Sequence, residues 1–316
     1  MDKRNKITVT GSSSQDYHVP VLLQQTLDGL AIQPGGVYVD CTFGGGGHSK
    51  EILKQLNADG KLFAFDQDAD AKSNLPEDNR VTFVPHNFRH LQRFLRLHKI
   101  AQADGIMADL GVSSHQFDEA DRGFSTRFDA DLDMRMDRRQ ALTAFDVINT
   151  YTETQLHKLF ETYGEVSNAK TLAKTIVAIR SSSSLKTVNN FKAALHPVVK
   201  GNPNKYFAQV FQALRIEVND EMGALRELLQ QIPPLLKPGG RVVIITFHSL
   251  EDRLVKNFFR KGTFEDGEEH PFENRVSSSV LKIITKKPVT AEEEEIKRNP
   301  RSRSAKLRVA EKIMDN

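Results

Sequence analysis

The stretch VYVDCTFGGGGHS, residues 37–49, decides the fold. Its first residues are an apolar run that ends at an acid, Asp40, and they predict a short strand. Four consecutive glycines, 44–47, follow, and glycine lets a backbone approach a ligand closely while it takes left-handed dihedral angles. Residues 49–56 predict a helix, whose first N–H groups and partial positive charge would face a ligand on the loop. The stretch therefore predicts a strand, a ligand-binding loop and a helix.

The residues around the loop indicate which ligand it binds. A second predicted strand, residues 61–66, ends at Asp66, about twenty residues past the loop, where a doubly wound sheet places the acceptor for ribose hydroxyls. The dinucleotide fingerprint Gly-x-Gly-x-x-Gly is incomplete, because Ser49 and Lys50 stand where its third glycine belongs. A carboxylate at Asp40 would repel a pyrophosphate but suit the amino group and sulfonium of S-adenosylmethionine. The stretch favours S-adenosylmethionine over NAD, and the alternative is a glycine loop that binds no ligand.

Length and composition predict a soluble, cytoplasmic protein with no membrane partner. The chain of 316 residues is long enough for about two domains, and 39% apolar and 27% charged residues are typical of globular proteins. The longest apolar run, residues 242–247, is too short to cross a bilayer, and the polar residues 1–15 predict a disordered arm. The single cysteine, Cys41, excludes an intramolecular disulfide and a multi-cysteine zinc site, and no metal site is predicted.

Further patterns predict a doubly wound α/β sheet with an inserted all-helical domain. Further strands are expected at residues 80–85, 104–111 and 237–247, and a closing antiparallel hairpin at 280–285 and 305–310. Helices are expected at residues 20–30, 91–97, 152–163, 168–180, 188–199, 205–214, 219–230 and 250–260. Strand ends then place Asp40, Asp66 and Asp109 along the carboxyl edge, where open α/β sheets bind ligands. We expect a sheet domain of residues 1–118 and 216–316 and an inserted domain of residues 119–215.

The C-terminal region carries a basic cluster. Residues 297–312 contain seven lysines or arginines against a single acid, Glu311, whereas the net charge of the whole chain is only +3. Such a cluster is typical of a strip that contacts phosphates. The alternative is a solvated tail that balances the acids at residues 292–295, and the sequence favours neither.

Six blocks of the sequence together resemble one protein family. They are VDCTFGGGGHS (39–49), DLGVSSHQ (109–116), RGFS (122–125), LDMRMD (132–137), FHSLEDR (247–253) and NPRSRS (299–304). They occur in order over nearly the whole chain and are similar to the blocks of the RsmH (MraW) family. This family consists of bacterial S-adenosylmethionine-dependent methyltransferases that act on N4 of one cytosine, position 1402, in the decoding region of 16S ribosomal RNA. The resemblance implies the Rossmann-like fold of class I methyltransferases.

The resemblance also implies a set of cofactor-binding residues. They are Gly46, Gly47 and His48 in the loop, Asp66 on the ribose, Phe88 beside the adenine, and Asp109 and Gln116 closing the site. The residues themselves support Asp66 by its spacing and Phe88 as an aromatic face after the third strand. The chain departs from the family at Asp131, where a proline is usual, and at KYFAQ (205–209), which replaces a His-Pro-Ala-Thr-Arg-type segment.

Asp109 is the candidate catalytic residue. Methyl transfer from a sulfonium is an in-line displacement, so holding the reacting atoms in line supplies much of the acceleration. An acceptor on an N4 hydrogen makes the cytosine nitrogen more nucleophilic and can later take its proton. Asp109 ends the fourth predicted strand and can fill this role. Alternatively, Asp109 contacts only the cofactor and a backbone carbonyl is the acceptor.

Other residues are candidates for holding the substrate. Four residues after the fifth strand either shape the pocket for the target base or cap a helix, with Ser249 as its N-cap: His248, Ser249, Glu251 and Asp252. The loop of residues 122–137 either grips a splayed base or packs its phenylalanine and methionine side chains inward. Arg301 and Arg303, together with the helical domain, are expected to bind RNA.

The expected partner is 16S ribosomal RNA within the small ribosomal subunit, with no DNA. One competing hypothesis is a methyltransferase that acts on amines of DNA or protein. Another is a non-catalytic, cofactor-sensing module that binds RNA. The sequence leaves open the oligomeric state, whether free RNA or an assembled subunit is the substrate, and whether a metal ion is essential.

Overall fold

The computed structural model describes residues 20–264 and 280–314, so the predicted arm of residues 1–15 lies outside it. The described residues include a seven-stranded sheet with the order β3-β2-β1-β4-β5-β7-β6. Its strands are β1 (Val37–Asp40), β2 (Lys61–Phe65), β3 (Val81–Val84), β4 (Ala103–Asp109), β5 (Leu236–Thr246), β6 (Leu281–Ile283) and β7 (Lys306–Lys312). The first five are parallel, and β7 pairs antiparallel with both β5 and β6. The predicted doubly wound sheet and its closing antiparallel pair are confirmed.

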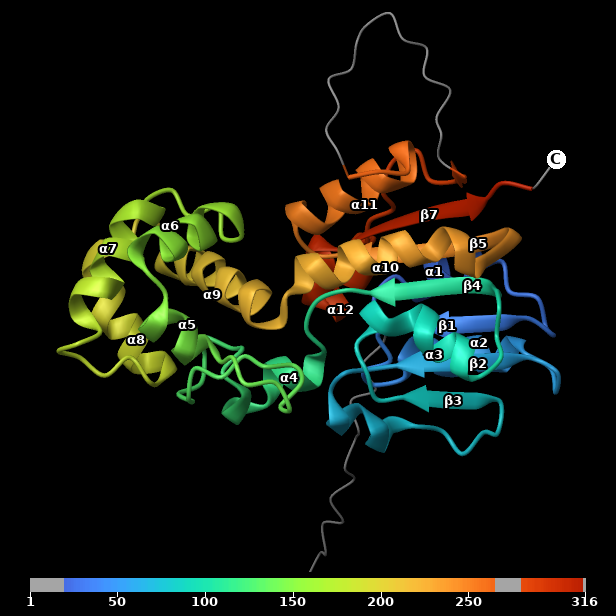
Figure 1. The fold of residues 1–316 in the computed structure, drawn as a ribbon, viewed down its shortest axis with the longest axis horizontal. Coiled ribbons are helices and arrows are strands. Elements are labelled where there is room, and N and C mark those ends of the chain that lie inside the picture. Colours follow the sequence, from blue (N-terminus) through green and yellow to red (C-terminus); the bar gives the residue numbers. More distant parts are fainter. Residues whose placement is uncertain (1–19, 265–279, 315–316) are drawn as a thin grey trace, which may run out of the picture.

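Helices cover both faces of the sheet (Figure 1). One face carries α1 (Leu23–Leu30) and α2 (Gly47–Gln55), and the other carries α3 (Leu91–Leu97), α10 (Glu221–Leu235) and α11 (Ser249–Lys261). Successive side chains of a strand point to opposite faces, so Tyr38 packs with α1 and α2 whereas Val39 packs with the other three helices. Burial on both faces explains why the parallel strands are nearly continuous apolar runs.

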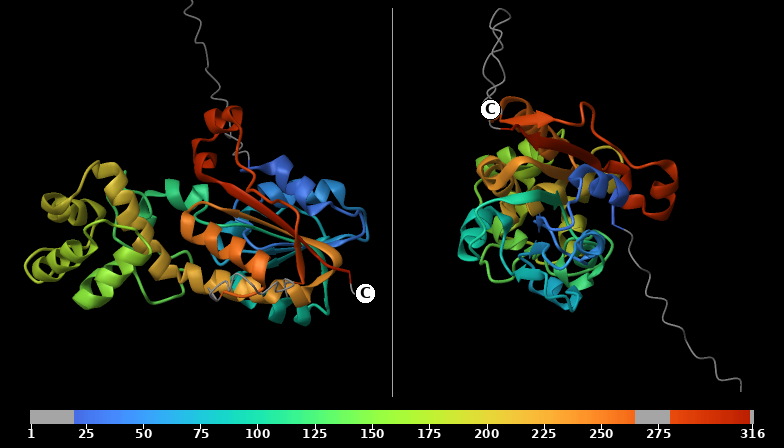
Figure 2. Two further views of the ribbon diagram at one scale, coloured as in Figure 1. Left: turned by 90° about the horizontal axis from the view of Figure 1, so that it is seen from above. Right: turned by 90° about the vertical axis from the view of Figure 1, so that its right-hand side faces the viewer.

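The residues between β4 and β5 form a helical unit beside the sheet, as Figure 1 and the left view of Figure 2 show. After the short α4 (Ser114–Asp118) come α5 (Ala144–Thr150), α6 (Glu153–Thr162), α7 (Ala169–Ile179), α8 (Val188–Leu195) and α9 (Pro203–Asn219). The unit has its own core, which extends from Phe124 to Val218. The sequence did not predict α5, and α9 continues past its predicted end. The boundary expected after residue 215 falls inside α9, so the division into domains stays a prediction.

The C-terminal segment ties the sheet to the helical unit. The side chain of Glu295, in α12 (Glu293–Arg298), accepts a hydrogen bond of 2.8 Å from the backbone N–H of Leu22. The next residues, Pro300–Ser304, bring Arg301 within 2.7 Å of Asp118 in α4. Among the helices of the described residues, none has the length and apolar character that spanning a membrane requires.

Candidate active site

A cavity of about 1190 Å³ lies at the carboxyl ends of the parallel strands, where the sequence predicted a ligand site. Its wall combines the glycine loop, the residues after β2 and β4, the start of α10, the first turn of α11 and Arg301. Pockets for drug-sized ligands measure about 300–1,000 Å³. This cavity is therefore large enough for a nucleoside cofactor together with a second nucleoside.

The glycine loop forms one wall of the cavity. Gly44 and Gly46 have positive φ angles of 49° and 73°, which explains two of the four glycines. Gly45 faces open space, since a Cβ on this residue would meet no atom within 4 Å, whereas a Cβ on Gly47 would collide with Pro20. The helix begins at Gly47, earlier than predicted, and Gly46 is its N-cap. Gly47 lines the cavity as expected, but Gly46 shapes the turn and is not part of the cavity wall.

Asp40 is not part of the cavity wall, although the sequence placed its carboxylate beside the cofactor. Its carboxylate is buried and accepts hydrogen bonds from the Ser49 hydroxyl at 2.7 Å and the Thr42 amide at 3.0 Å. Burial raises the pKa of Asp40, and the contact with Ser49 opposes this rise. Asp40 therefore fixes the loop to the first turn of α2.

Asp66 lies where the sequence placed it, at the end of β2 and in the cavity wall. Its two oxygens accept hydrogen bonds from the amides of Gly44, at 2.7 Å, and Asp68, at 2.8 Å. Burial raises the pKa of Asp66 to about 6, although both amide contacts lower it. Each oxygen keeps a second lone pair for a ligand hydroxyl. Phe88 also lines the cavity, after β3.

Asp109 and His48 lie together at the end of β4. The Asp109 amide donates to Thr42 Oγ1 at 2.7 Å, but its side-chain Oδ1 is buried without a hydrogen-bond partner. Burial raises the pKa of Asp109 well above its usual value, and the nearby Asp40 and Glu251 add to the rise. Oδ2 lies 3.8 Å from His48 Nδ1. Burial lowers the pKa of His48, whose Nε2 donates to the carbonyl oxygen of Val21 at 3.0 Å, so Nδ1 of the neutral ring turns a lone pair toward Asp109.

Gln116 lines the cavity but its side chain is already hydrogen-bonded. Its Oε1 accepts from the Ser113 amide at 3.1 Å in a capping box that opens α4, and its Nε2 donates to Asp68 Oδ2 at 2.8 Å. Gln116 is buried, with 4% of its surface exposed. It can therefore position the segment that closes the site, as well as contact a ligand.

Arg122 is a positioning residue whose role the sequence did not reveal. It is 2% exposed and pairs with Asp68 at 2.8 Å and with Asp70 at 3.1 Å. The same guanidinium donates to the backbone carbonyls of Arg135, at 3.0 Å, and Met136, at 3.2 Å. Arg122 thus joins the segment after β2 to the loop of residues 122–137. Arg122 opens one of the blocks that resemble the family, which was the available signal. Its acidic partners are too far away in sequence to be predicted from it.

The four residues after β5 divide between capping and the cavity. The N-cap of α11 is His248 rather than Ser249, and its side chain and that of Glu251 cap each other's backbone amides. Asp252 instead pairs with Arg308 at 2.7 Å. Of the four, only Glu251 lines the cavity. Of these four residues, only Glu251 therefore remains a candidate for shaping the pocket of the target base.

The two arginines expected to bind RNA have different surroundings. Arg301 lines the cavity and pairs with Asp118, whereas Arg303 is exposed and is not part of the cavity wall. Another member of the basic cluster, Arg308, is buried against Asp252. Part of the cluster therefore stabilises the fold, and Arg301 is the member placed at the site.

The loop of residues 122–137 packs largely inward. Phe124 and Met134 are buried in the core of the helical unit, while Phe128 is 37% exposed under the guanidinium of Arg127, 5.4 Å from the ring centroid. Met136 and Arg138 extend the cavity wall toward the helical unit. Phe124 and Met134 therefore pack inward, as one of the two alternatives expected, whereas Phe128 does not.

The cavity fits S-adenosylmethionine. Asp66 offers acceptors for ribose hydroxyls, Phe88 offers an aromatic face, and the N-terminus of α2 presents amide groups. Asp109 Oδ1 is a buried acceptor that has no partner among the described residues. Such an atom indicates a ligand, because buried polar groups are ordinarily hydrogen-bonded.

A family model and curated proteins match this chain over nearly its full length. The model of the MraW methylase family matches residues 15–313. "Ribosomal RNA small subunit methyltransferase H" of Parabacteroides distasonis is 53% identical, over 94% of this chain and 98% of the relative. The protein of the same name from Flavobacterium johnsoniae is 53% identical, over 96% of this chain and 100% of the relative.

Solved structures resemble the chain only distantly. An rRNA methylase from Streptococcus thermophilus has a TM-score of 0.39 at 12% identity, over 92% of this chain and 95% of that chain. TrmN from Thermus thermophilus has a TM-score of 0.41 at 14% identity, over 92% of this chain and 48% of that chain. Likeness of this degree carries no argument about function.

Proposed function

The chain belongs to the MraW methylase family, and from this premise we propose that it methylates N4 of one cytosine, position 1402, in 16S ribosomal RNA of the small ribosomal subunit. Its methyl donor is S-adenosylmethionine, as expected for a methylase of this family. When bound, this donor supplies a methyl group on a positively charged sulfur. The residues of the chain bind the donor, hold the target amine in line with it and accept a hydrogen from the amine.

We assign donor binding to the residues at the carboxyl edge of the sheet. Asp66 accepts hydrogen bonds from the ribose hydroxyls, and Phe88 packs its ring on the adenine. The other expected contacts come from the loop and the wall: Gly46, Gly47, His48, Asp109 and Gln116. Gly46 acts through the shape of the turn, and Gln116 acts partly through its bond to Asp68.

The observation that carries the proposal is the unpartnered Oδ1 of Asp109. Burial raises the pKa of this carboxyl, and the nearby carboxylates of Asp40 and Glu251 add to the rise. A positive charge placed beside a carboxyl favours its ionised form, so Asp109 becomes a better acceptor in the loaded enzyme. In that state it accepts a hydrogen bond from an N4–H and so directs the nitrogen lone pair toward the methyl carbon. It then takes that proton as the bond from N4 to the methyl carbon forms and the methyl–sulfur bond breaks.

The target base has to leave its stacked position before its N4 can reach the donor. The cavity volume leaves room for it, and Arg301 lies at the wall next to α4. We assign RNA binding to Arg301, Arg303 and the inserted helical domain, residues 119–215, with residues 1–118 and 216–316 as the methyltransferase domain. A ribosomal substrate places this activity in the cytoplasm.

A transfer assay tests the proposal. Purified protein is incubated with labelled S-adenosylmethionine and either small subunits that lack the modification, naked 16S RNA or DNA. We expect N4-methylcytidine in ribosomal RNA, and a kcat lower by about 10²–10⁴ for Asp109→Asn. Asp59→Asn, at an exposed turn, is the matched control. Label in DNA alone, or in none of the substrates, would refute the reaction, whereas full activity of Asp109→Asn would refute only the role of Asp109.

A further inference from the structure

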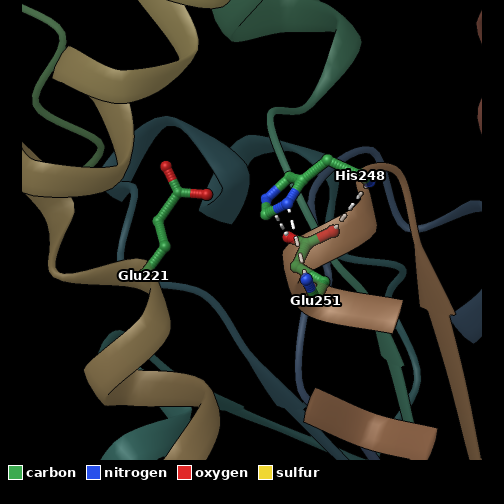
Figure 3. A group of neighbouring side chains, drawn as sticks. All are labelled: Glu221, His248 and Glu251. Atoms are coloured by element: carbon green, nitrogen blue, oxygen red, sulfur yellow. Dashed lines mark hydrogen bonds and ion pairs between the residues drawn. The ribbon is translucent and has the colours of Figure 1, made fainter. Parts of the chain in front are cut away.

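Three side chains from two elements converge beside the cavity, as Figure 3 shows. Glu221 begins α10, His248 is the N-cap of α11, and Glu251 lies in the first turn of α11. One ligand atom from each lies within 4.8 Å of the others. Glu221 and Glu251 line the cavity, whereas His248 is not part of its wall.

His248 carries an unexplained buried nitrogen. Its side chain is 8% exposed, and Nε2 makes no hydrogen bond although it lies 3.2 Å from Glu251 Oε1. Buried polar groups are ordinarily hydrogen-bonded or bound to a ligand, so this nitrogen indicates a partner that the described residues do not supply. Two ligands of one ion, each about 2.0–2.2 Å from it, lie about 3.0–3.5 Å apart. The separation of Nε2 and Oε1 therefore matches two ligands of a shared ion.

Hydrogen bonds fix the orientation of both carboxylates. Glu221 accepts from Arg215 Nε at 2.8 Å and from Nη2 at 3.0 Å, which fixes its orientation and leaves a lone pair on each oxygen. Glu251 Oε2 accepts a hydrogen bond from the Phe247 amide at 2.9 Å, and Oε1 is the oxygen that lies beside His248. Two carboxylates against one guanidinium leave excess negative charge at the site.

We propose that Glu221, His248 and Glu251 bind one divalent transition-metal ion of the Zn²⁺ or Mn²⁺ class. One imidazole nitrogen with two carboxylate oxygens suits these ions, whereas Mg²⁺ and Ca²⁺ prefer oxygen ligands alone. Binding exchanges the weak 3.4 Å contact from the Glu251 amide to His248 Nδ1 for a metal–nitrogen bond at Nε2. The site departs from the sequence prediction of no metal, because its ligands meet only in the fold.

A metal titration tests this site without RNA or methyl donor, so its outcome is independent of the proposed function. Untagged full-length protein is freed of metal with a chelator and titrated with Co²⁺, followed by visible absorption, and with Zn²⁺ and Mn²⁺, followed by calorimetry. We expect one ion per chain. His248→Asn should weaken binding at least tenfold, because asparagine keeps the N-cap but removes the ligand nitrogen.

The matched control is Glu227→Gln on the same helix, where the carboxylate pairs with Arg89 outside the site. It should bind the ion as the unmodified protein does. Glu221→Gln serves as the second variant, with circular dichroism to verify folding of each protein. Absence of saturable binding of Co²⁺, Zn²⁺ and Mn²⁺ at one ion per chain would overturn the proposal. Equal affinities of His248→Asn and Glu227→Gln would overturn it as well.

Discussion

Lowering the pH from 8 to 5 should weaken binding of the methyl donor through Asp66. This residue has a pKa of about 6 in the cofactor-free protein, raised chiefly by burial. The ionised carboxylate can accept hydrogen bonds at both oxygens, whereas protonation turns one oxygen into a donor. Ribose hydroxyls that donate to Asp66 therefore select the ionised form, and protons compete with the ligand.

The size of the effect follows from that pKa. The apparent dissociation constant rises by the factor 1 + 10^(6−pH), which is about twofold at pH 6 and about elevenfold at pH 5, or about 1.4 kcal/mol. Protonation of Asp66 has the opposite effect on folding: it weakens ligand binding but favours the folded state. Because the pKa of Asp66 is raised from 3.8 on folding, its contribution to the free energy of unfolding is largest at low pH and is lost as pH rises from about 4 to 6.

Calorimetry with S-adenosylhomocysteine, the stable product, measures this at constant ionic strength and pH 5, 6 and 8. Asp66→Asn should bind more weakly and show no such pH dependence, while Asp59→Asn should behave as the unmodified protein. An affinity of the unmodified protein that changes less than twofold between pH 5 and 8 would refute the reasoning. If the affinity of Asp66→Asn still fell with pH, a group other than Asp66 would cause the pH dependence.

Three further substitutions have defined outcomes. Gly46→Ala should lower the Tm and abolish cofactor binding, since at φ 73° its Cβ would lie 2.8 Å from the Phe43 ring; an unchanged thermal unfolding curve would contradict this. Arg122→Leu should cost about 3–5 kcal/mol of unfolding free energy in denaturant titrations, because it removes the ion-pair partner of the buried Asp68 carboxylate, and a cost under 1 kcal/mol would count against it. Arg301→Ala combined with Arg303→Ala should weaken RNA binding in a filter assay and lower its logarithmic salt slope by roughly 1–2, with cofactor affinity intact; unchanged RNA binding would discard this assignment.

The sheet was predictable because its signals are local. Each parallel strand is a short apolar run; β1 ends at the predicted residue, and β2 ends one residue before its predicted end. Parallel strands share a carboxyl edge, so Asp66 and Asp109 could be placed in one cavity before the fold was known. The block resemblance added His48 and Gln116, both of which line that cavity.

Helix limits in the inserted unit were harder to predict. The missed α5 has only 7 residues, although its capping box, Thr143 with Asp146, was a readable signal. The predicted end of α9 was too early because the buried Ile216 and Val218 continue its apolar face. Short helices depend on tertiary packing more than on their own propensity, so local patterns define their ends poorly.

Side-chain direction and distant partners could not be predicted from local pattern. Asp40 was expected at the cofactor, but the hydroxyl of Ser49, nine positions on, binds its carboxylate. Arg122 reaches Asp68 across 54 positions, and only the fold brings them together. The group of Glu221, His248 and Glu251 likewise depends on the packing of α10 beside α11.

The central claim is that this chain methylates N4 of a single cytosine in small-subunit RNA. Mass spectrometry of nucleosides and mapped fragments of 16S ribosomal RNA tests it, in cells that lack the gene and in cells that regain it. We predict that the methyl group on N4 of cytosine 1402 disappears without the protein, returns with the unmodified chain and stays absent with Asp66→Asn. An undiminished N4 methyl group in the cells that lack the gene would contradict the account.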